Sequence, residues 1–111
     1  MKQTEKQIEN AILDYLTLLP GTYWKNNSTG VFDPTKKVFR KSPKFHRNGV
    51  SDILGIDADG RFVAIEVKTP KGRLSENQKL FLDDINHFGG IAFVARSVDD
   101  VRERLVGQST N

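Results

Sequence analysis

The spacing of apolar residues predicts three amphipathic helices. Apolar positions recur every three or four residues from Glu5 until Pro20-Gly21, from about Glu76 to Phe88, and again after Ser97. The first two segments each begin with a capping box, in which a Thr or Ser cap precedes Gln by three residues. These pairs are Thr4 with Gln7 and Ser75 with Gln78. The second helix is expected to turn Phe81, Ile85 and Phe88 toward the core.

Short runs rich in Val, Ile, Leu and Phe predict the strands. Two short strands are expected at Thr22 to Asn27 and Lys36 to Lys41, followed by a hairpin of Val50 to Asp57 and Arg61 to Lys68, and by a buried strand at Ile91 to Ala95. Because a helix separates the hairpin from the last strand, that strand should lie parallel to one of the central strands. The sequence therefore predicts an α/β fold with a mixed central β-sheet flanked by helices.

The hairpin loop determines which residues of its two strands face each other. The loop after Asp57 has three residues, the last of them a glycine where a left-handed conformation is needed. If Asp57 faces Arg61, then Asp52 lies opposite Glu66. Lys68 shares a face with Glu66, because side chains alternate along a strand. Two carboxylates and an ammonium group are therefore expected on one side of the hairpin.

A pair of carboxylates at this distance favours a bound cation. Opposed like charges destabilise a sheet pair unless a positive charge lies between them. Oxygen ligands that leave positions for water suit Mg²⁺ or Mn²⁺, so we expect Asp52 and Glu66 to bind one of these ions. The alternative is an exposed hairpin face on which Glu66 and Lys68 are ordinary surface residues, since Glu-x-Lys by itself is a common pattern.

Length and composition exclude several classes of protein. With 111 residues, of which 37% are hydrophobic and 28% charged, the chain is expected to form one globular domain over residues 1–111. The absence of cysteine excludes disulfides, a thiol nucleophile and zinc-thiolate sites. No apolar run has membrane-spanning length and the first residues are polar, so we expect no membrane association and a cytoplasmic location.

The excess of positive charge is concentrated in residues 36–47. This segment has six basic residues and no acid, whereas residues 1–35 have three bases and four acids, and residues 48–111 have eight and ten. A basic patch beside a metal site suits a polyanion. The alternative is a solvated loop, because most charge runs are solvated surface. The basic residues are Lys36, Lys37, Arg40, Lys41, Lys44 and Arg47.

These elements and motifs resemble the virus-type replication-repair nuclease (VRR-NUC) branch of the PD-(D/E)XK nuclease superfamily. The resemblance covers nearly the whole chain, and the similar segments are Thr4-Glu5, Trp24 with Asn26-Asn27, Gly49-Val50-Ser51-Asp52, Glu66-Val67-Lys68, and Leu74-Ser75 with Gln78. Ser51 stands where the family usually has Pro, a change that leaves the acidic residue in place. The resemblance implies a restriction-endonuclease-like αβββαβ core.

The resemblance also implies roles for the hairpin residues. Asp52 and Glu66 would bind Mg²⁺ or Mn²⁺, with the Val67 carbonyl as a third ligand. Lys68 would orient or activate the attacking water and offset charge on the phosphate. The implied reaction is metal-assisted hydrolysis of a DNA phosphodiester bond.

Further roles are implied outside the hairpin. Glu5 matches the family's N-terminal helix glutamate, a metal ligand. Glu9, one turn later, is a competitor, and both residues have an ordinary explanation as acids near a helix start. Gln78 matches a glutamine at the edge of the catalytic site, although its capping box alone explains it. Lys71 and Arg73 would join the basic segment in binding DNA phosphates.

The stand-alone phage and bacterial members of this branch resemble Holliday junction resolvases that act as homodimers. The resemblance thus implies branched DNA, a four-way junction above all, as the substrate, in the cytoplasm of a bacterial or phage-infected cell. A two-fold dimer matches the near two-fold symmetry of such a junction. Two alternatives are a non-catalytic DNA-binding module that keeps the nuclease fold, and a nuclease subunit of a larger DNA-processing system.

Overall fold

The helices and strands follow the predicted order along the chain, with one addition, the two-residue strand β2. The computed structural model describes residues 2–27, 32–33, 38–39 and 45–107. Within these ranges, no helix combines the length and the apolar character that crossing a bilayer requires. The helices are α1 (Glu5–Leu16), α2 (Glu76–His87) and α3 (Val98–Leu105), and the strands are β1 (Gly21–Lys25), β2 (Phe32–Asp33), β3 (Val38–Phe39), β4 (Ile53–Asp57), β5 (Phe62–Val67) and β6 (Ile91–Ala95).

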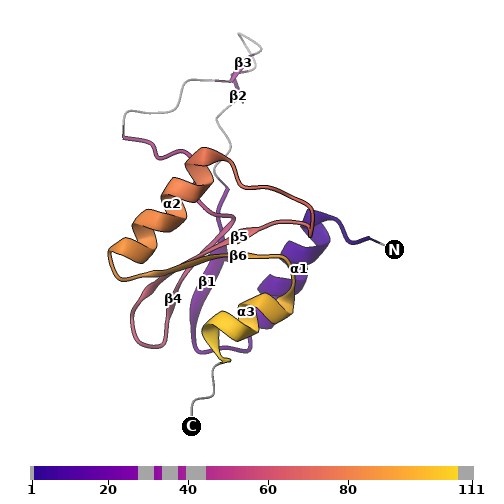
Figure 1. Cartoon of the computed structure of the whole chain (residues 1–111), viewed down its shortest axis with the longest axis vertical. Helices are drawn as coiled ribbons and strands as arrows, with labels where there is room; N and C mark the ends of the chain where they lie inside the picture. Colours follow the sequence, from indigo (N-terminus) through magenta and orange to yellow (C-terminus); the bar gives the residue numbers. More distant parts are fainter. Residues whose placement is uncertain (1, 28–31, 34–37, 40–44, 108–111) are drawn as a thin grey trace.

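A four-stranded sheet organises the chain. Its strand order is β1-β4-β5-β6, with β1 antiparallel to β4, β4 antiparallel to β5, and β5 parallel to β6 (Figure 1). The parallel pair follows from the α2 crossover that joins its strands. β2 and β3 pair with each other in a separate small sheet. The α/β class and the mixed sheet are therefore confirmed, and α1, β1, β4, β5, α2 and β6 form the expected αβββαβ core.

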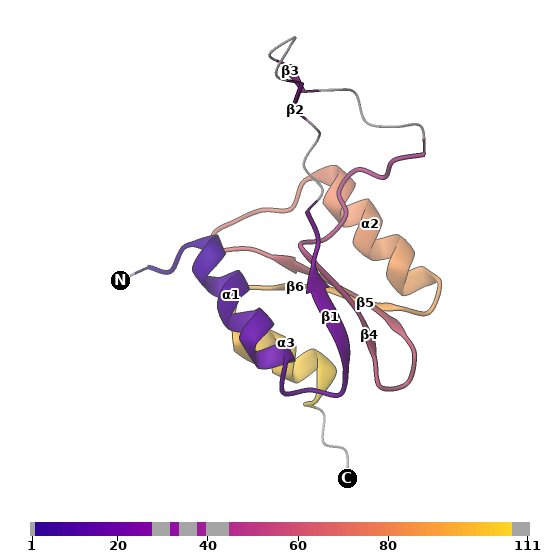
Figure 2. The same ribbon diagram turned by 180° about the vertical axis from the view of Figure 1, so that it is seen from behind.

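Helices cover both faces of the four-stranded sheet. α1 and α3 lie on one face, where Ile12 and Val101 pack with Ile65 (Figures 1 and 2). α2 lies on the other face, where Phe81 packs with Ala64. Because β5 is central and covered on both faces, all of it except its first residue is buried. Any polar side chain on β5 is therefore inside the protein.

β4 and β5 pair in the predicted register. Ile53 lies opposite Ile65, which places Asp52 opposite Glu66 one residue further on. The loop glycine, Gly60, has a φ of +84°, the left-handed conformation expected for it. Both strands are shorter than predicted.

Both predicted capping boxes are present, at the starts of α1 and α2. One prediction for α2 is wrong: Phe88 is 82% exposed rather than buried. α2 ends at His87, so Phe88 lies past the last helical residue and outside the core. Leu82, only 6% exposed, contributes to the core beside Phe81 instead.

Candidate active site

Asp52 lies at the end of the sheet, immediately before β4, and backbone groups hold it on two sides. Its Oδ2 accepts a hydrogen bond from the Val67 N–H at 2.8 Å, at the end of β5. Its carbonyl oxygen accepts one from the Asn26 N–H at 2.7 Å, just past β1. The ends of β1, β4 and β5 thus fix the position of this carboxylate.

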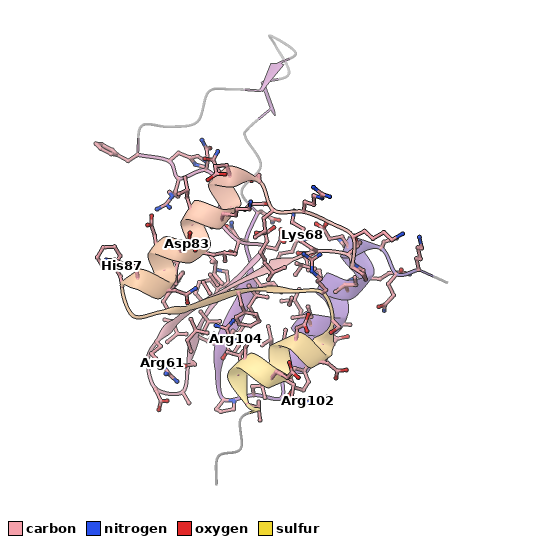
Figure 3. The ribbon with its side chains drawn as sticks, in the orientation of Figure 1. Arg61, Lys68, Asp83, His87, Arg102 and Arg104 are labelled. Carbon is pink, nitrogen blue, oxygen red and sulfur yellow. The ribbon has the colours of Figure 1, made fainter. Side chains whose placement is uncertain are left out.

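Glu66 is the most buried acidic residue in the described part of the chain, with 2% of its surface exposed. Its Oε2 accepts a hydrogen bond from the Gln78 Nε2 at 3.0 Å and lies 3.8 Å from the Lys68 Nζ. Its Oε1 is buried without a hydrogen-bond partner among the described residues. Figure 3 shows Lys68 at the end of β5, beside the segment that leads into α2.

The environment of Glu66 disfavours its charged form. Burial raises the pKa of its carboxyl to about 8, and the negative charge of Asp52 acts in the same direction, while the Lys68 ammonium lowers the pKa in part. A buried carboxylate with an unpaired oxygen and an acidic neighbour is suited to a positively charged ligand. Two carboxylates are hard oxygen donors, so this donor set fits a divalent cation such as Mg²⁺ or Mn²⁺.

Gln78 takes part in the capping box and in the site at the same time. Its Oε1 accepts a hydrogen bond from the Ser75 N–H at 2.8 Å, and its Nε2 donates to Glu66. The sequence left these two roles as competing explanations, and one side chain fulfils both. Gly49 makes this possible, because a Cβ there would come within 2.4 Å of the Asn77 carbonyl and force α2 away from the chain before β4.

The two glutamates of α1 have different surroundings. Glu9 is buried and forms an ion pair with Lys25 of β1 at 3.3 Å. Glu5 is exposed in the first turn of α1. After burial and Asp52, the charge of Glu5 is a further cause that raises the pKa of Glu66. Of the two, Glu5 is therefore the one whose carboxylate influences the hairpin site.

The possible ligands at this site come from side chains and from the backbone. Within the described ranges, no three Asp, Glu, His or Cys side chains come together as ligands of one ion. Asp52 and Glu66 are thus the two side-chain donors that the fold brings together. In an extended strand, the N–H and C=O of one residue point to the same neighbouring strand. Since the Val67 N–H binds Asp52, the Val67 carbonyl lies on the same side.

The predicted DNA-binding residues fall into three groups. Lys36, Lys37, Arg40, Lys41 and Lys44 lie outside the described residues. Arg47 is engaged with α2, because its guanidinium pairs with Asp84 at 2.7 Å and lies 5.3 Å from the centre of the Phe81 ring. Lys71 and Arg73 are exposed on the loop between β5 and α2, which begins at Lys68.

Sequence reasoning missed two basic residues near the site. Lys25 forms an ion pair with Glu9. Arg96, just after β6, donates hydrogen bonds to two carbonyl oxygens of the loop that follows Lys68. Arg96 was detectable in principle, because the parallel pairing of β5 with β6 brings the ends of both strands to one edge of the sheet. Lys25 was not, because its partner depends on how α1 packs.

One of three comparisons with known proteins identifies a family for this chain. The family model for the VRR-NUC domain matches residues 3–99, from just before the cap of α1 to the first turn of α3. No curated protein and no solved structure gives a significant match. The matched segment contains the hairpin acids, Lys68 and Gln78. Because the match covers most of the chain, this protein belongs to the VRR-NUC family and is a nuclease-type domain with a restriction-endonuclease-like fold.

Proposed function

We propose that this protein is a metal-dependent DNA endonuclease that cuts branched DNA, with the four-way junction as its main substrate. The observation that carries the proposal is the cluster at the end of β5. There, Glu66 is buried with an Oε1 that has no hydrogen-bond partner among the described residues, beside Asp52, Gln78 and the Lys68 ammonium. This combination is unfavourable for stability alone and suited to binding a cation and a phosphate.

Asp52, Glu66 and the Val67 carbonyl would hold the Mg²⁺ or Mn²⁺, and Glu5 of α1, which does not form a three-carboxylate cluster with them, would bind the ion through one of its waters. Glu5 is favoured over Glu9, since Lys25 already neutralises Glu9. When bound, the cation supplies Lewis acidity to the scissile phosphate and to the attacking water.

The other residues act through position and charge. The Lys68 ammonium orients the attacking water and offsets negative charge that develops on the phosphate. Gln78 holds the Oε2 of Glu66, which fixes the direction of that carboxylate. The basic residues of the 36–47 segment, with Lys71 and Arg73, bind phosphates of the DNA backbone without reading its sequence.

The junction and a homodimer belong together in this proposal. Two sites related by a two-fold axis can make paired nicks across a four-way junction, which is itself nearly two-fold symmetric. An exposed apolar surface supports a second copy: Trp24, Ile56 and Phe62 are 44%, 41% and 36% exposed on neighbouring strands of the sheet. The reaction would take place in the cytoplasm, where the DNA is.

The main alternative is a DNA-binding module that keeps the fold without cleaving. It requires salt-sensitive DNA binding with no cleavage in any divalent metal. The presence of Asp52, Glu66 and Lys68 together argues against it, because binding alone needs none of the three in a buried cluster.

A cleavage panel tests the proposal. The substrates are a four-way junction, a flap, single-stranded DNA and linear duplex, each in Mg²⁺, in Mn²⁺ and in EDTA, with the product ends mapped. We expect paired nicks on the junction that require the metal.

Asp52→Asn and Lys68→Ala should lose at least about a hundredfold in rate while still binding DNA. The matched control is Asp83→Asn, an exposed carboxylate of α2 away from the hairpin site (Figure 3). Cleavage that survives both site substitutions would refute the assignment.

A further inference from the structure

An open cavity of about 440 Å³ lies next to the hairpin site. Its walls come from the segment before α1, from Ile8 on α1 and from the loop after β5. Both ribbon views show the start of α1 beside the segment that leads from β5 toward α2 (Figures 1 and 2). Thr69 in this wall directly follows Lys68, and Ile8 lies one turn after Glu5. The cavity therefore adjoins the proposed catalytic centre.

The charge of the cavity wall is entirely positive. Lys2, Lys71 and Arg96 line it, and none of the described residues in its wall is acidic. In the described part of the chain, Lys2 and Lys71 form no ion pair, and no carboxylate pairs with the Arg96 guanidinium. The nearest carboxylate to Arg96, that of Asp100, accepts a hydrogen bond from the Arg96 backbone N–H at 2.8 Å and is not part of the wall. Three cationic side chains in a wall without acidic residues are suited to an anion.

Arg96 gives the cavity a fixed wall. Its Nη1 donates hydrogen bonds to the carbonyl oxygens of Thr69 at 2.5 Å and Gly72 at 2.8 Å, so it holds both ends of the turn that carries Lys71. The half-buried Arg96 follows β6 directly, and the Ala95 carbonyl before it accepts a hydrogen bond from the Lys68 N–H at 3.1 Å. The same residues thus link the cavity wall to the position of Lys68.

We propose that this cavity binds a backbone phosphate of the DNA next to the one that is cut, with Lys2 and Lys71 as its ligands and Arg96 as the residue that positions the loop. This inference rests on the proposed function and extends it, because it identifies where the cleaved strand continues past the catalytic centre. An anion held at a fixed distance from Lys68 would set the scissile bond in register with the catalytic residues.

The first test uses inorganic phosphate and needs no cleavage. Phosphate is titrated into the ¹⁵N-labelled protein at constant ionic strength, with chloride as the reference anion. We expect saturable shifts of the backbone amide signals of Thr69, Lys71 and Gly72 and of the Arg96 side-chain signal, and their loss in the Lys2→Gln/Lys71→Gln double variant. The control is Arg102→Gln, which removes one positive charge from α3 (Figure 3). The guanidinium of Arg102 is exposed and paired with Asp99. Shifts that are absent, or that persist in the double variant, would overturn the proposal.

The second test uses junction DNA with single neutral methylphosphonate linkages placed in turn on either side of the cut. In the wild type, one such linkage close to the cut should raise KM about tenfold with kcat nearly unchanged, and in the double variant it should have no further effect. The double variant should also make the slope of log Kobs against log salt about one unit less negative. Equal effects of the linkage in both proteins would contradict a shared contact.

The two tests separate this proposal from the proposed function. A protein that binds phosphate at these residues but cuts no DNA refutes the nuclease assignment and leaves the anion site standing. A protein that cuts junctions but shows neither phosphate-dependent shifts nor coupling to the linkage refutes the anion site alone.

Discussion

At the scale of single residues, Glu66 combines burial, an unpaired oxygen and an acidic neighbour. Such a group costs folding free energy in the absence of a cation. Local hydrogen bonds fix its position: Gln78 of α2 donates to Oε2, and the neighbouring Asp52 accepts from the Val67 N–H of β5. The fold thus fixes the Glu66 carboxylate in place, and a positively charged ligand is needed to neutralise its charge.

Glu66→Gln should therefore stabilise the metal-free protein while removing its response to metal. The amide is neutral and of the same size, and we expect the free energy of unfolding in EDTA to rise by about 1 to 3 kcal/mol. Mg²⁺ should raise the melting temperature of the wild type and leave that of the variant unchanged. Thermal melts in EDTA and in Mg²⁺ measure both effects, with Asp83→Asn as the control. A variant that is less stable than the wild type in EDTA would show that the carboxylate is structurally satisfied.

The residues predicted from the sequence are those whose neighbours are close along the chain. Asp52, Glu66 and Lys68 belong to one hairpin, so the loop length was enough to place them on one site. The capping spacing placed Gln78 at the start of α2, and its role at the site was implied by the family resemblance. Arg96 escaped prediction, because its partners Thr69 and Gly72 are 27 and 24 residues away and meet it only through a parallel strand pair.

At the scale of elements, the β4-β5 turn sets the register that brings the two acids together. Asp57 stabilises this turn: its Oδ1 accepts hydrogen bonds from the Asp59 N–H at 3.0 Å and the Arg61 N–H at 2.9 Å, and its Oδ2 pairs with the Arg61 guanidinium at 3.0 Å. Burial alone would raise the pKa of Asp57, but these backbone donors and Arg61 outweigh it and hold the pKa below its usual value.

Asp57→Asn should lower the free energy of unfolding at pH 7 by about 1 to 2 kcal/mol. A carboxyl whose pKa is lower in the folded state stabilises the protein above its unfolded pKa of about 3.9, and this contribution is lost as the pH falls through the folded pKa. The difference between wild type and variant should therefore be constant from pH 5 to 7 and shrink below about pH 4. Urea unfolding at several pH values measures it. The same difference at pH 3 and pH 7 would mean that the carboxylate charge plays no part in the turn.

Element boundaries were less predictable than element types. The hydrophobic period of α2 was read one residue too far, so Phe88 was assigned to the core. α2 ends at His87, and two residues later Gly89 turns the chain with a φ of +96°. The hairpin strands were also predicted too long, by residues 50–52 before β4 and by Arg61 and Lys68 at the two ends of β5. Patterns along the sequence identify which face is buried, whereas neighbours in space decide where an element ends.

At the scale of the whole molecule, the sheet is covered unevenly. α2 packs on β5 and β6, while the same face of β1 and β4 carries Trp24 and Ile56, with Phe62 of β5 beside them. All three are at least one third exposed, and among the described strands β1 is an edge strand that pairs with β4 alone. Trp24 is 44% exposed, Tyr23 is half-buried against the core, and the side chain of Phe32 lies outside the described set.

This surface leads to the last prediction, on oligomeric state. If two copies meet through the exposed face of β1 and β4, the wild type should elute with twice the mass of one chain in size-exclusion chromatography with light scattering. The Trp24→Thr/Phe62→Thr variant should elute as a monomer, because it removes two large apolar side chains while Thr keeps a high strand propensity. Leu18→Thr is the control: it removes an apolar side chain that is 77% exposed just past α1, the helix on the opposite face of the sheet, and should leave the dimer intact. A double variant that folds and remains dimeric would place the interface elsewhere, and a monomeric wild type that still makes paired nicks would show that the junction is cut by two independent encounters.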